Sequence, residues 1–281
     1  MTGTAWVLGA GGVTGGAWET GILYGFAQAG TGIAGDDLII GSSAGAVVGA
    51  QLASGLLGLL ELYELQLADP RDMTGGRLGA LTVLRYAGAV LSARTPEAYG
   101  RKLARIAQGA RLGITADERR AAIAGRLPSV DWPERPLRIT AVDAATGELH
   151  TFDRESEVPL VDAVTASCAV PAVWPVATVG GRSWIDGGVH SPANAHLAAG
   201  HRRVVVIAPT ASGNKAIASP RSQAAELVAQ GARVEVITPD AAARKAFGRN
   251  PLDPGHRAAA ARAGLAQAAS HTEAVAAVVS S

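Results

Sequence analysis

The alternation of apolar and glycine-rich segments predicts two strand–loop–helix units in the N-terminal part of the chain. A short apolar run at Ala5–Leu8 ends in a glycine-rich loop, which leads into a helical stretch. A second apolar run, Leu38–Ile40, ends in a turn and continues into Ala44–Leu52, which is predicted to be a second helix. Such units are typical of α/β domains, whose functional loops lie at the carboxyl ends of their strands.

The pattern becomes helical after residue 56 and extended again near residue 137. Leucine, alanine and arginine recur at helical spacing over 56–126, apart from a short strand expected near 81–84, so residues 56–135 are predicted to be a helical insertion. Further strands are expected at 137–142, 149–152, 203–208 and 234–237, with a helix near 223–230 and a helical tail from residue 241. No repeat or low-complexity linker divides the chain, so we predict a single domain, 1–281, with an inserted lid.

Composition limits the possible function classes. The chain has 281 residues, of which 48% are apolar and 17% charged, and its 35 glycines follow no collagen-like period, so the protein is expected to be globular. The net charge is +1 and no segment concentrates basic and aromatic residues, which argues against nucleic acid as a partner. The single cysteine, Cys168, excludes an internal disulfide and a zinc site built from cysteines.

One uncharged segment, residues 38–60, is long enough to cross a bilayer. It contains five glycines and three serines and lacks basic flanks and an aromatic belt, so we expect a buried strand, turn and helix instead. The first ten residues lack the basic region of a signal peptide, and we therefore expect a cytoplasmic protein.

The pentapeptide Gly41-Ser42-Ser43-Ala44-Gly45 matches G-x-S-x-G and lies between a predicted strand and a predicted helix. Small residues on both sides allow the tight turn that exposes a nucleophilic hydroxyl. The start of the following helix favours negative charge. Ser43 is therefore the candidate nucleophile.

The glycine loop at residues 9–16 has two functional interpretations beside that of a plain strand-to-helix turn. Dinucleotide binding requires G-x-G-x-x-G, but the sixth position is Thr14, and the acidic pair Asp36 and Asp37 precedes the second strand instead of following it. An oxyanion hole requires convergent backbone N–H groups, which glycines leave accessible. The neighbouring nucleophile motif favours the oxyanion hole.

The candidate base follows a later extended segment. None of the six histidines lies in a motif typical of a catalytic base, although His190 and His196 remain possible bases. Asp186, in Asp186-Gly187-Gly188 after the extended run 182–185, is the stronger candidate, although an Asp-Gly pair is also common in plain turns.

Four motifs in this order resemble those of patatin-like phospholipases: the glycine loop leading to residues 21–23, the G-x-S-x-G turn, the stretch 166–175 with Pro171 and Pro175, and Asp186-Gly187-Gly188. The resemblance covers roughly the first 55 residues and residues 137–210. It implies a three-layer α/β sandwich with a central, mainly parallel sheet and a helical insertion forming a lid.

The resemblance also implies the chemistry. It assigns Ser43 as nucleophile and Asp186 as base, without histidine, and the oxyanion donors to the amides of Gly11, Gly12 and Val13. The implied function is a serine acyl hydrolase that cleaves fatty-acyl esters or phospholipids with no cofactor and no metal. The family's third loop glycine is Val13 here, and its basic residue is Gly15, which leaves a non-catalytic acyl-binding protein as an alternative. The dinucleotide interpretation of the glycine loop leaves, less readily, an oxidoreductase.

Contact with the membrane surface is a further expectation. Six leucines, which could also belong to the core, could line an acyl channel or face a lipid surface: Leu52, Leu56, Leu57, Leu59, Leu60 and Leu62.

Overall fold

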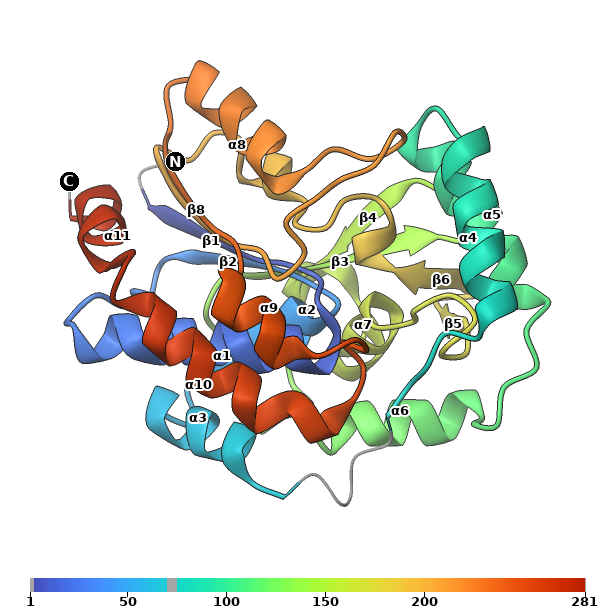
Figure 1. Ribbon diagram of the computed structural model, residues 1–281, viewed down its shortest axis with the longest axis horizontal. Helices are drawn as coiled ribbons and strands as arrows, with labels where there is room; N and C mark the ends of the chain where they lie inside the picture. The colour runs from blue at the N-terminus through green and yellow to red at the C-terminus, as the bar shows by residue number, and fades with distance from the viewer. Residues whose placement is uncertain (1–2, 70–74, 281) are drawn as a thin grey trace.

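A computed structural model describes residues 3–69 and 75–280 as a mixed α/β fold built around one sheet (Figure 1). Its strands are β1 (Thr4–Leu8), β2 (Leu38–Ser42), β3 (Leu137–Asp143), β4 (Leu149–Phe152), β5 (Ala177–Val179), β6 (Arg182–Asp186), β7 (Arg203–Ile207) and β8 (Arg233–Ile237). Within the described residues they form one sheet in the order β5-β6-β3-β2-β1-β7-β8, and β4 pairs with β3. The central strands β3, β2, β1, β7 and β8 run parallel, whereas β4, β5 and β6 join antiparallel.

Helices cover both faces of this sheet. The helices are α1 (Gly12–Gln28), α2 (Ala44–Ser54), α3 (Leu59–Leu67), α4 (Ala80–Ser92), α5 (Pro96–Gln108), α6 (Ala116–Ala124), α7 (Leu160–Ser167), α8 (Pro220–Ala229), α9 (Ala241–Phe247), α10 (Arg257–Ala268) and α11 (Thr272–Val279). The three-layer arrangement with a mainly parallel sheet, expected from the sequence, is confirmed.

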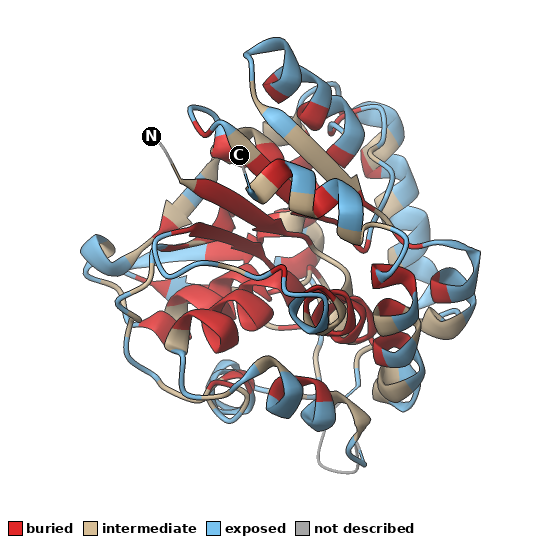
Figure 2. Ribbon diagram, turned by 90° about the vertical axis from the view of Figure 1, so that its left-hand side faces the viewer, coloured by how far each residue is buried: buried red, intermediate tan, exposed pale blue. Residues whose placement is uncertain are grey.

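Alternate residues of the strands explain why two helical layers form. In β1, Trp6 and Leu8 pack into the core shared with α1, α2, α7 and α10. Their neighbours Ala5 and Val7 face the opposite layer, which contains α8. All four side chains are buried, and Figure 2 shows the strands as a buried layer between helices whose outer faces are exposed. A strand buried on both faces explains the continuous apolar run in the sequence.

Within the described residues, the insertion contributes four helices, which pack against different parts of the fold. Helix α3 packs against α1 and α10, α4 packs against α5, and α6 packs against α7. The short strand expected at 81–84 is wrong, because these residues lie within α4. Helix α4 buries Ala89 and packs Tyr86 and Val90 against α5, a helical spacing that overrides the extended preference of its β-branched residues.

The uncharged segment 38–60 forms β2, α2 and the beginning of α3, with Ile39, Ile40 and Val47 in the core. The expected strand, turn and helix are confirmed. Among the residues that the structure describes, no helix is long and apolar enough to cross a membrane.

Candidate active site

Ser43 occupies a sharp turn between β2 and α2. Its φ of 55° and ψ of −114° place a non-glycine residue in a strained region, which orients its hydroxyl away from the strand. The turn packs closely against β1, since a Cβ on Gly45 would lie 2.1 Å from the carbonyl oxygen of Leu8. The sequence motif therefore has the local geometry of a nucleophile turn.

The hydroxyl of Ser43 contacts the carboxylate of Asp186, which ends β6. Ser43 Oγ donates to Asp186 Oδ2 at 2.6 Å, and both side chains are 5% exposed. The other carboxylate oxygen accepts a bond of 2.8 Å from the amide of Gly188. Two residues separated by 143 positions in the chain are thus brought together.

The electrostatics of this pair suit proton transfer. Burial raises the pKa of the Asp186 carboxyl from an ordinary 3.8 to about 6, against the opposing effects of the bonds from Ser43 and Gly188 and of the charge on Arg119. A base whose pKa lies close to neutrality is both ionised and basic enough to accept a proton at physiological pH.

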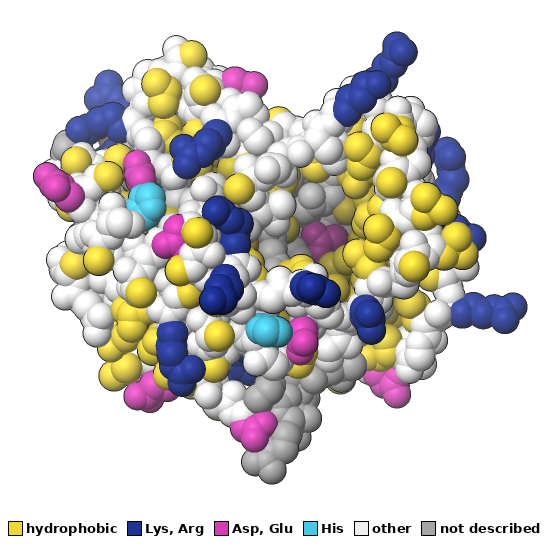
Figure 3. Space-filling model, in the orientation of Figure 1, with side chains coloured by type: hydrophobic (Ala, Val, Ile, Leu, Met, Phe, Trp, Pro, Cys, Tyr) yellow, Lys and Arg dark blue, Asp and Glu magenta, His cyan; other side chains and the backbone are white. Residues whose placement is uncertain are grey.

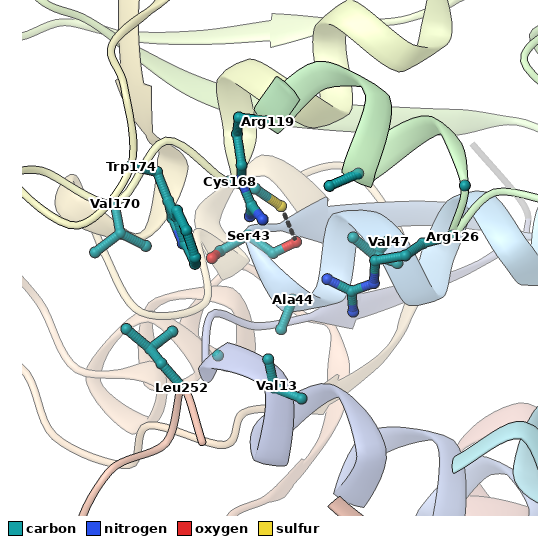
Figure 4. A pocket seen from close by; sticks show the side chains of 13 residues that line it. Val13, Ser43, Ala44, Val47, Arg119, Arg126, Cys168, Val170, Trp174 and Leu252 are labelled. Carbon is teal, nitrogen blue, oxygen red and sulfur yellow. Dashed lines mark hydrogen bonds between the residues drawn. The ribbon is translucent and has the colours of Figure 1, made fainter. Parts of the chain in front are cut away.

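The end of α7 fixes the backbone of the serine. Ser167 Oγ accepts the amide hydrogen of Ser43 at 2.8 Å, and Cys168 Sγ donates to the Ser43 carbonyl oxygen at 3.2 Å (Figure 4). Burial raises the pKa of Cys168 to about 12, so the thiolate required of a cysteine nucleophile is scarce near neutral pH. Cys168 therefore makes a structural contact with the Ser43 backbone, and its burial disfavours the thiolate.

A buried network also joins the serine turn to the aspartate turn. Asn194, with a φ of 56°, donates through Nδ2 to Ser42 Oγ at 2.9 Å and to the Gly187 carbonyl at 3.0 Å. Ser42 Oγ also bonds Thr140 Oγ1 of β3 at 2.7 Å. Sequence reasoning missed Asn194. The only hint in the sequence was the residue type, because asparagine adopts the left-handed backbone conformation more readily than most residues.

The glycine loop lies beside the serine at the start of α1. The Gly9 carbonyl accepts the amide hydrogen of Gly45 at 3.1 Å, which ties the loop to the nucleophile turn. Among the described residues, the amides of Gly11, Gly12 and Val13 have no hydrogen-bond acceptor. These three amides belong to the first turn of a helix, where unsatisfied N–H groups attract negative charge.

Two cavities meet at Ser43. The larger, of about 470 Å³, is mainly apolar and is lined by Tyr86, Tyr99 and Leu103 of the insertion and by Asp186. The smaller, of about 340 Å³, contains two arginines and lies on the side of α6. Ser43 and Gly12 line both cavities, and Figure 3 shows the hollowed centre of this face of the molecule.

A comparison with family models matches residues 7–199 to "Patatin-like phospholipase". The chain belongs to the patatin-like phospholipase family. Membership implies a lipid acyl hydrolase. A comparison with curated proteins found no match.

Two solved structures resemble this patatin-like phospholipase over nearly its whole length. VipD from Legionella pneumophila has 11% identity and a TM-score of 0.46, and the match covers 97% of this chain and 67% of VipD. The type III effector ExoU has 14% identity and a TM-score of 0.40, and the match covers 98% of this chain and 53% of ExoU. The chain thus spans about half the length of ExoU.

In this patatin-like phospholipase, the two histidines considered as bases, His190 and His196, bond residues other than Ser43. His190 bonds Asn194 at 3.2 Å and His196 bonds Gln223 at 2.9 Å. Among the described residues, neither imidazole bonds Ser43. Burial lowers the pKa of His196 to about 4 and that of His190 below its ordinary value.

Gly15 stands where the family has a basic residue, and the structure shows little space for a side chain at this position. A Cβ on Gly15 would lie 2.8 Å from Cβ of Pro209, so this patatin-like phospholipase has no room for a larger side chain there without movement of Pro209. The side chain of Val13 lines the smaller cavity.

The acidic residues considered for a dinucleotide site have another role. Asp37 accepts bonds from the Thr4 amide, the Trp6 indole and the Ala34 amide, at 3.1, 3.0 and 2.9 Å. These bonds anchor the beginning of β1. In the described part of the chain, no group of three or more histidine, cysteine or acidic residues is arranged to hold a metal.

Proposed function

We propose that the protein is a serine lipid acyl hydrolase of the phospholipase A, lysophospholipase or carboxylesterase type, which works through a Ser43–Asp186 dyad. The observation that carries the proposal is the 2.6 Å bond between two buried side chains at the junction of two cavities. The amides of Gly11, Gly12 and Val13, which bond no acceptor among the described residues, support it, because an oxyanion needs such free donors.

The reaction has two steps. Ser43 Oγ attacks the ester carbonyl carbon while its proton passes to Asp186, and the loop amides stabilise the oxyanion. Collapse breaks the ester bond, and the departing alcohol takes the proton from Asp186. A water molecule then attacks the acyl-enzyme, with Asp186 accepting its proton, and the fatty acid leaves with Ser43 restored.

Labelling by a fluorophosphonate and hydrolysis of a chromogenic acyl ester test this proposal. We expect the wild type to be labelled and active, and Ser43→Ala and Asp186→Asn to lose hydrolysis. His190→Ala and His196→Ala are the matched controls and should retain appreciable activity. A histidine variant as inactive as Ser43→Ala would refute the dyad. An unlabelled wild type would instead favour an acyl-binding protein without catalysis.

Peripheral membrane contact is proposed at α4, beside the larger cavity. The six leucines at 52–62 differ in exposure: Leu52 and Leu62 are buried, whereas Leu56 and Leu60 are exposed. On α4, exposed apolar side chains include Leu84 and Leu91, which are 69% and 75% exposed. Figure 3 shows apolar side chains gathered over α4 and α5.

The surroundings of α4 favour an anionic lipid surface. Arg85 lies within the helix, Arg77 and Arg94 flank it, all three are exposed, and α4 contains no acidic residue. Tyr86 of the same helix lines the cavity and donates to the Pro171 carbonyl at 2.6 Å, so a surface that contacts α4 would lie next to the entrance.

Vesicle flotation tests this contact. Wild-type protein should float with vesicles that contain anionic lipid, and Leu84→Asp with Leu91→Asp should abolish flotation. Val228→Asp on α8, where Val228 is also exposed, is the matched control and should still float. Equal flotation of all variants would refute α4 as the contact.

A further inference from the structure

The insertion places two arginines against the nucleophile. Arg119 on α6 and Arg126 in the turn after it both line the smaller cavity, together with Ser43. In Figure 4 the two guanidinium groups point from different sides toward the space next to the serine. Neither residue belongs to the dyad or to the glycine loop.

Arg119 is held by stacking on an aromatic ring, and within the described part of the chain its side chain forms no hydrogen bond. It is 8% exposed, its guanidinium stacks over Trp174 at 4.1 Å, and its buried Nε has no acceptor among the described residues. Burial lowers the pKa of Arg119, but an arginine stays protonated in proteins. A buried charge without a partner is costly, so its retention needs an explanation.

Arg126 is held by its backbone and leaves its charge available. Its carbonyl accepts a bond of 2.9 Å from Gln51 Nε2 of α2, which fixes the turn. Within the described ranges, no carboxylate pairs with its guanidinium or with that of Arg119. No acidic side chain lines this cavity.

Three other arginines have a carboxylate partner. Arg120, the neighbour of Arg119 on α6, pairs with Asp162, and Arg154 and Arg182 pair with Glu134 and Asp143. Among the described residues, Arg119 thus combines burial with the absence of a carboxylate ion pair, whereas the side chains of the three paired arginines are 46–57% exposed.

We propose that Arg119 and Arg126 form an anion subsite that binds a phosphate group on the alcohol portion of the substrate, so that the enzyme prefers acyl esters with a phosphate near the scissile bond. This inference rests on the proposed function. Two guanidinium forks suit a phosphate because each can bond two of its oxygens. The mainly apolar larger cavity then receives the acyl chain.

A phosphate in the smaller cavity leaves Asp186 able to transfer the proton to the leaving alcohol. In the tetrahedral intermediate the leaving oxygen and Ser43 Oγ are attached to the same carbon. Since Asp186 contacts Oγ at 2.6 Å, it is within reach of the leaving oxygen while the phosphate lies in the smaller cavity.

Two water-soluble esters test the subsite: 1-hexanoylglycerol-3-phosphate and 1-hexanoylglycerol. Both have the same acyl chain and neither requires a lipid surface. We expect the kcat/KM of the phosphate ester to exceed that of the neutral ester at least about tenfold, the effect of a charge-assisted hydrogen bond. Arg119→Gln and Arg126→Gln should each reduce this ratio about tenfold or more. Arg120→Gln, with the same loss of charge on the same helix, should leave the ratio unchanged.

The ratio separates substrate recognition from indirect effects. Any effect of Arg119→Gln on the Asp186 pKa acts on both esters alike and cancels in the ratio. If Arg119→Gln does not fold, Arg126→Gln still tests the subsite. As a second measurement, inorganic phosphate should inhibit neutral-ester hydrolysis competitively in the wild type, and more weakly in Arg126→Gln.

The outcomes distinguish the two proposals. Ester hydrolysis that survives Ser43→Ala refutes the dyad itself. Hydrolysis that depends on Ser43, with a ratio that neither arginine substitution changes, overturns the anion subsite alone. Noncompetitive inhibition by phosphate also overturns it, because it places the anion outside the substrate's position.

Discussion

Asp186→Asn should abolish activity and yet make folding less sensitive to pH. The carboxyl is buried, and its pKa rises from an ordinary 3.8 to about 6. A raised pKa means that the folded state holds the proton more tightly than the unfolded state does, so stability falls as pH rises from about 4 to about 6. At about 1.4 kcal/mol per pKa unit, ionised Asp186 costs the folded state about 3 kcal/mol above pH 6.

Asparagine cannot ionise, so this pH dependence disappears in the variant. It retains one carbonyl acceptor, so one of the two bonds from Ser43 Oγ and the Gly188 amide is lost, at about 1 kcal/mol at every pH. The informative quantity is therefore the change with pH: the stability of Asp186→Asn relative to wild type should rise by about 2 kcal/mol between pH 4 and pH 7.

Urea unfolding at pH 4, 5, 6 and 7 measures this change, provided that both proteins unfold in a two-state transition with similar m-values. Ser43→Ala is the matched control, because it keeps the carboxyl and removes a hydrogen bond that lowers its pKa. Its pH-dependent loss of stability should extend above pH 6. A difference between Asp186→Asn and wild type that stays constant with pH would refute the raised pKa.

Three further predictions concern the same region. In a pH–rate profile, wild-type kcat/KM should fall as pH drops through about 6, where Asp186 becomes protonated. Arg119→Gln should move this fall to higher pH, because the charge on Arg119 lowers the pKa of Asp186. Burial raises the pKa of Glu19 on α1 well above its ordinary value, so Glu19→Gln should gain stability over wild type as pH rises above about 4.5 in chemical unfolding, and a pH-independent difference would contradict this. Gly45→Ala should cost about 1–3 kcal/mol in thermal unfolding because its Cβ would overlap the Leu8 carbonyl, whereas Gly88→Ala, where a Cβ meets no atom within 4 Å, should stabilise α4.

The sequence contained enough to predict the alternating units of the fold. Leu38–Ile40, followed by the G-x-S-x-G turn, indicated a strand and a helix because both the apolar run and the small residues have strong local meanings. The strand expected at 81–84 failed because its β-branched residues lie in α4, where contacts with α5 decide the conformation.

The site was only partly predictable for a similar reason. Ser43 follows β2 and Asp186 ends β6, each in a recognisable motif, although their contact depends on the pairing of β6 with β3. The roles of Asn194 and Arg119 depend on burial and on neighbours distant in the chain, so no local pattern distinguishes these residues from others of their kind. Such roles emerge only when the topology brings the segments together.

The sheet positions Ser43 and Asp186, whereas the insertion contributes to the walls of the cavities, and this separation has an evolutionary consequence. β3 lies between β2 and β6. Its Thr140 pairs with β2 and its Ala141 pairs with β6, so the hydrogen bonds of this one strand set the distance between Ser43 and Asp186. The segment between β2 and β3 supplies part of the lining of both cavities, including Arg119 and Arg126 in the smaller and Tyr86, Tyr99 and Leu103 in the larger. Changes in that segment can therefore alter which ester is accepted while the chemical apparatus is inherited intact, and grafting it between relatives is a direct way to exchange their selectivity.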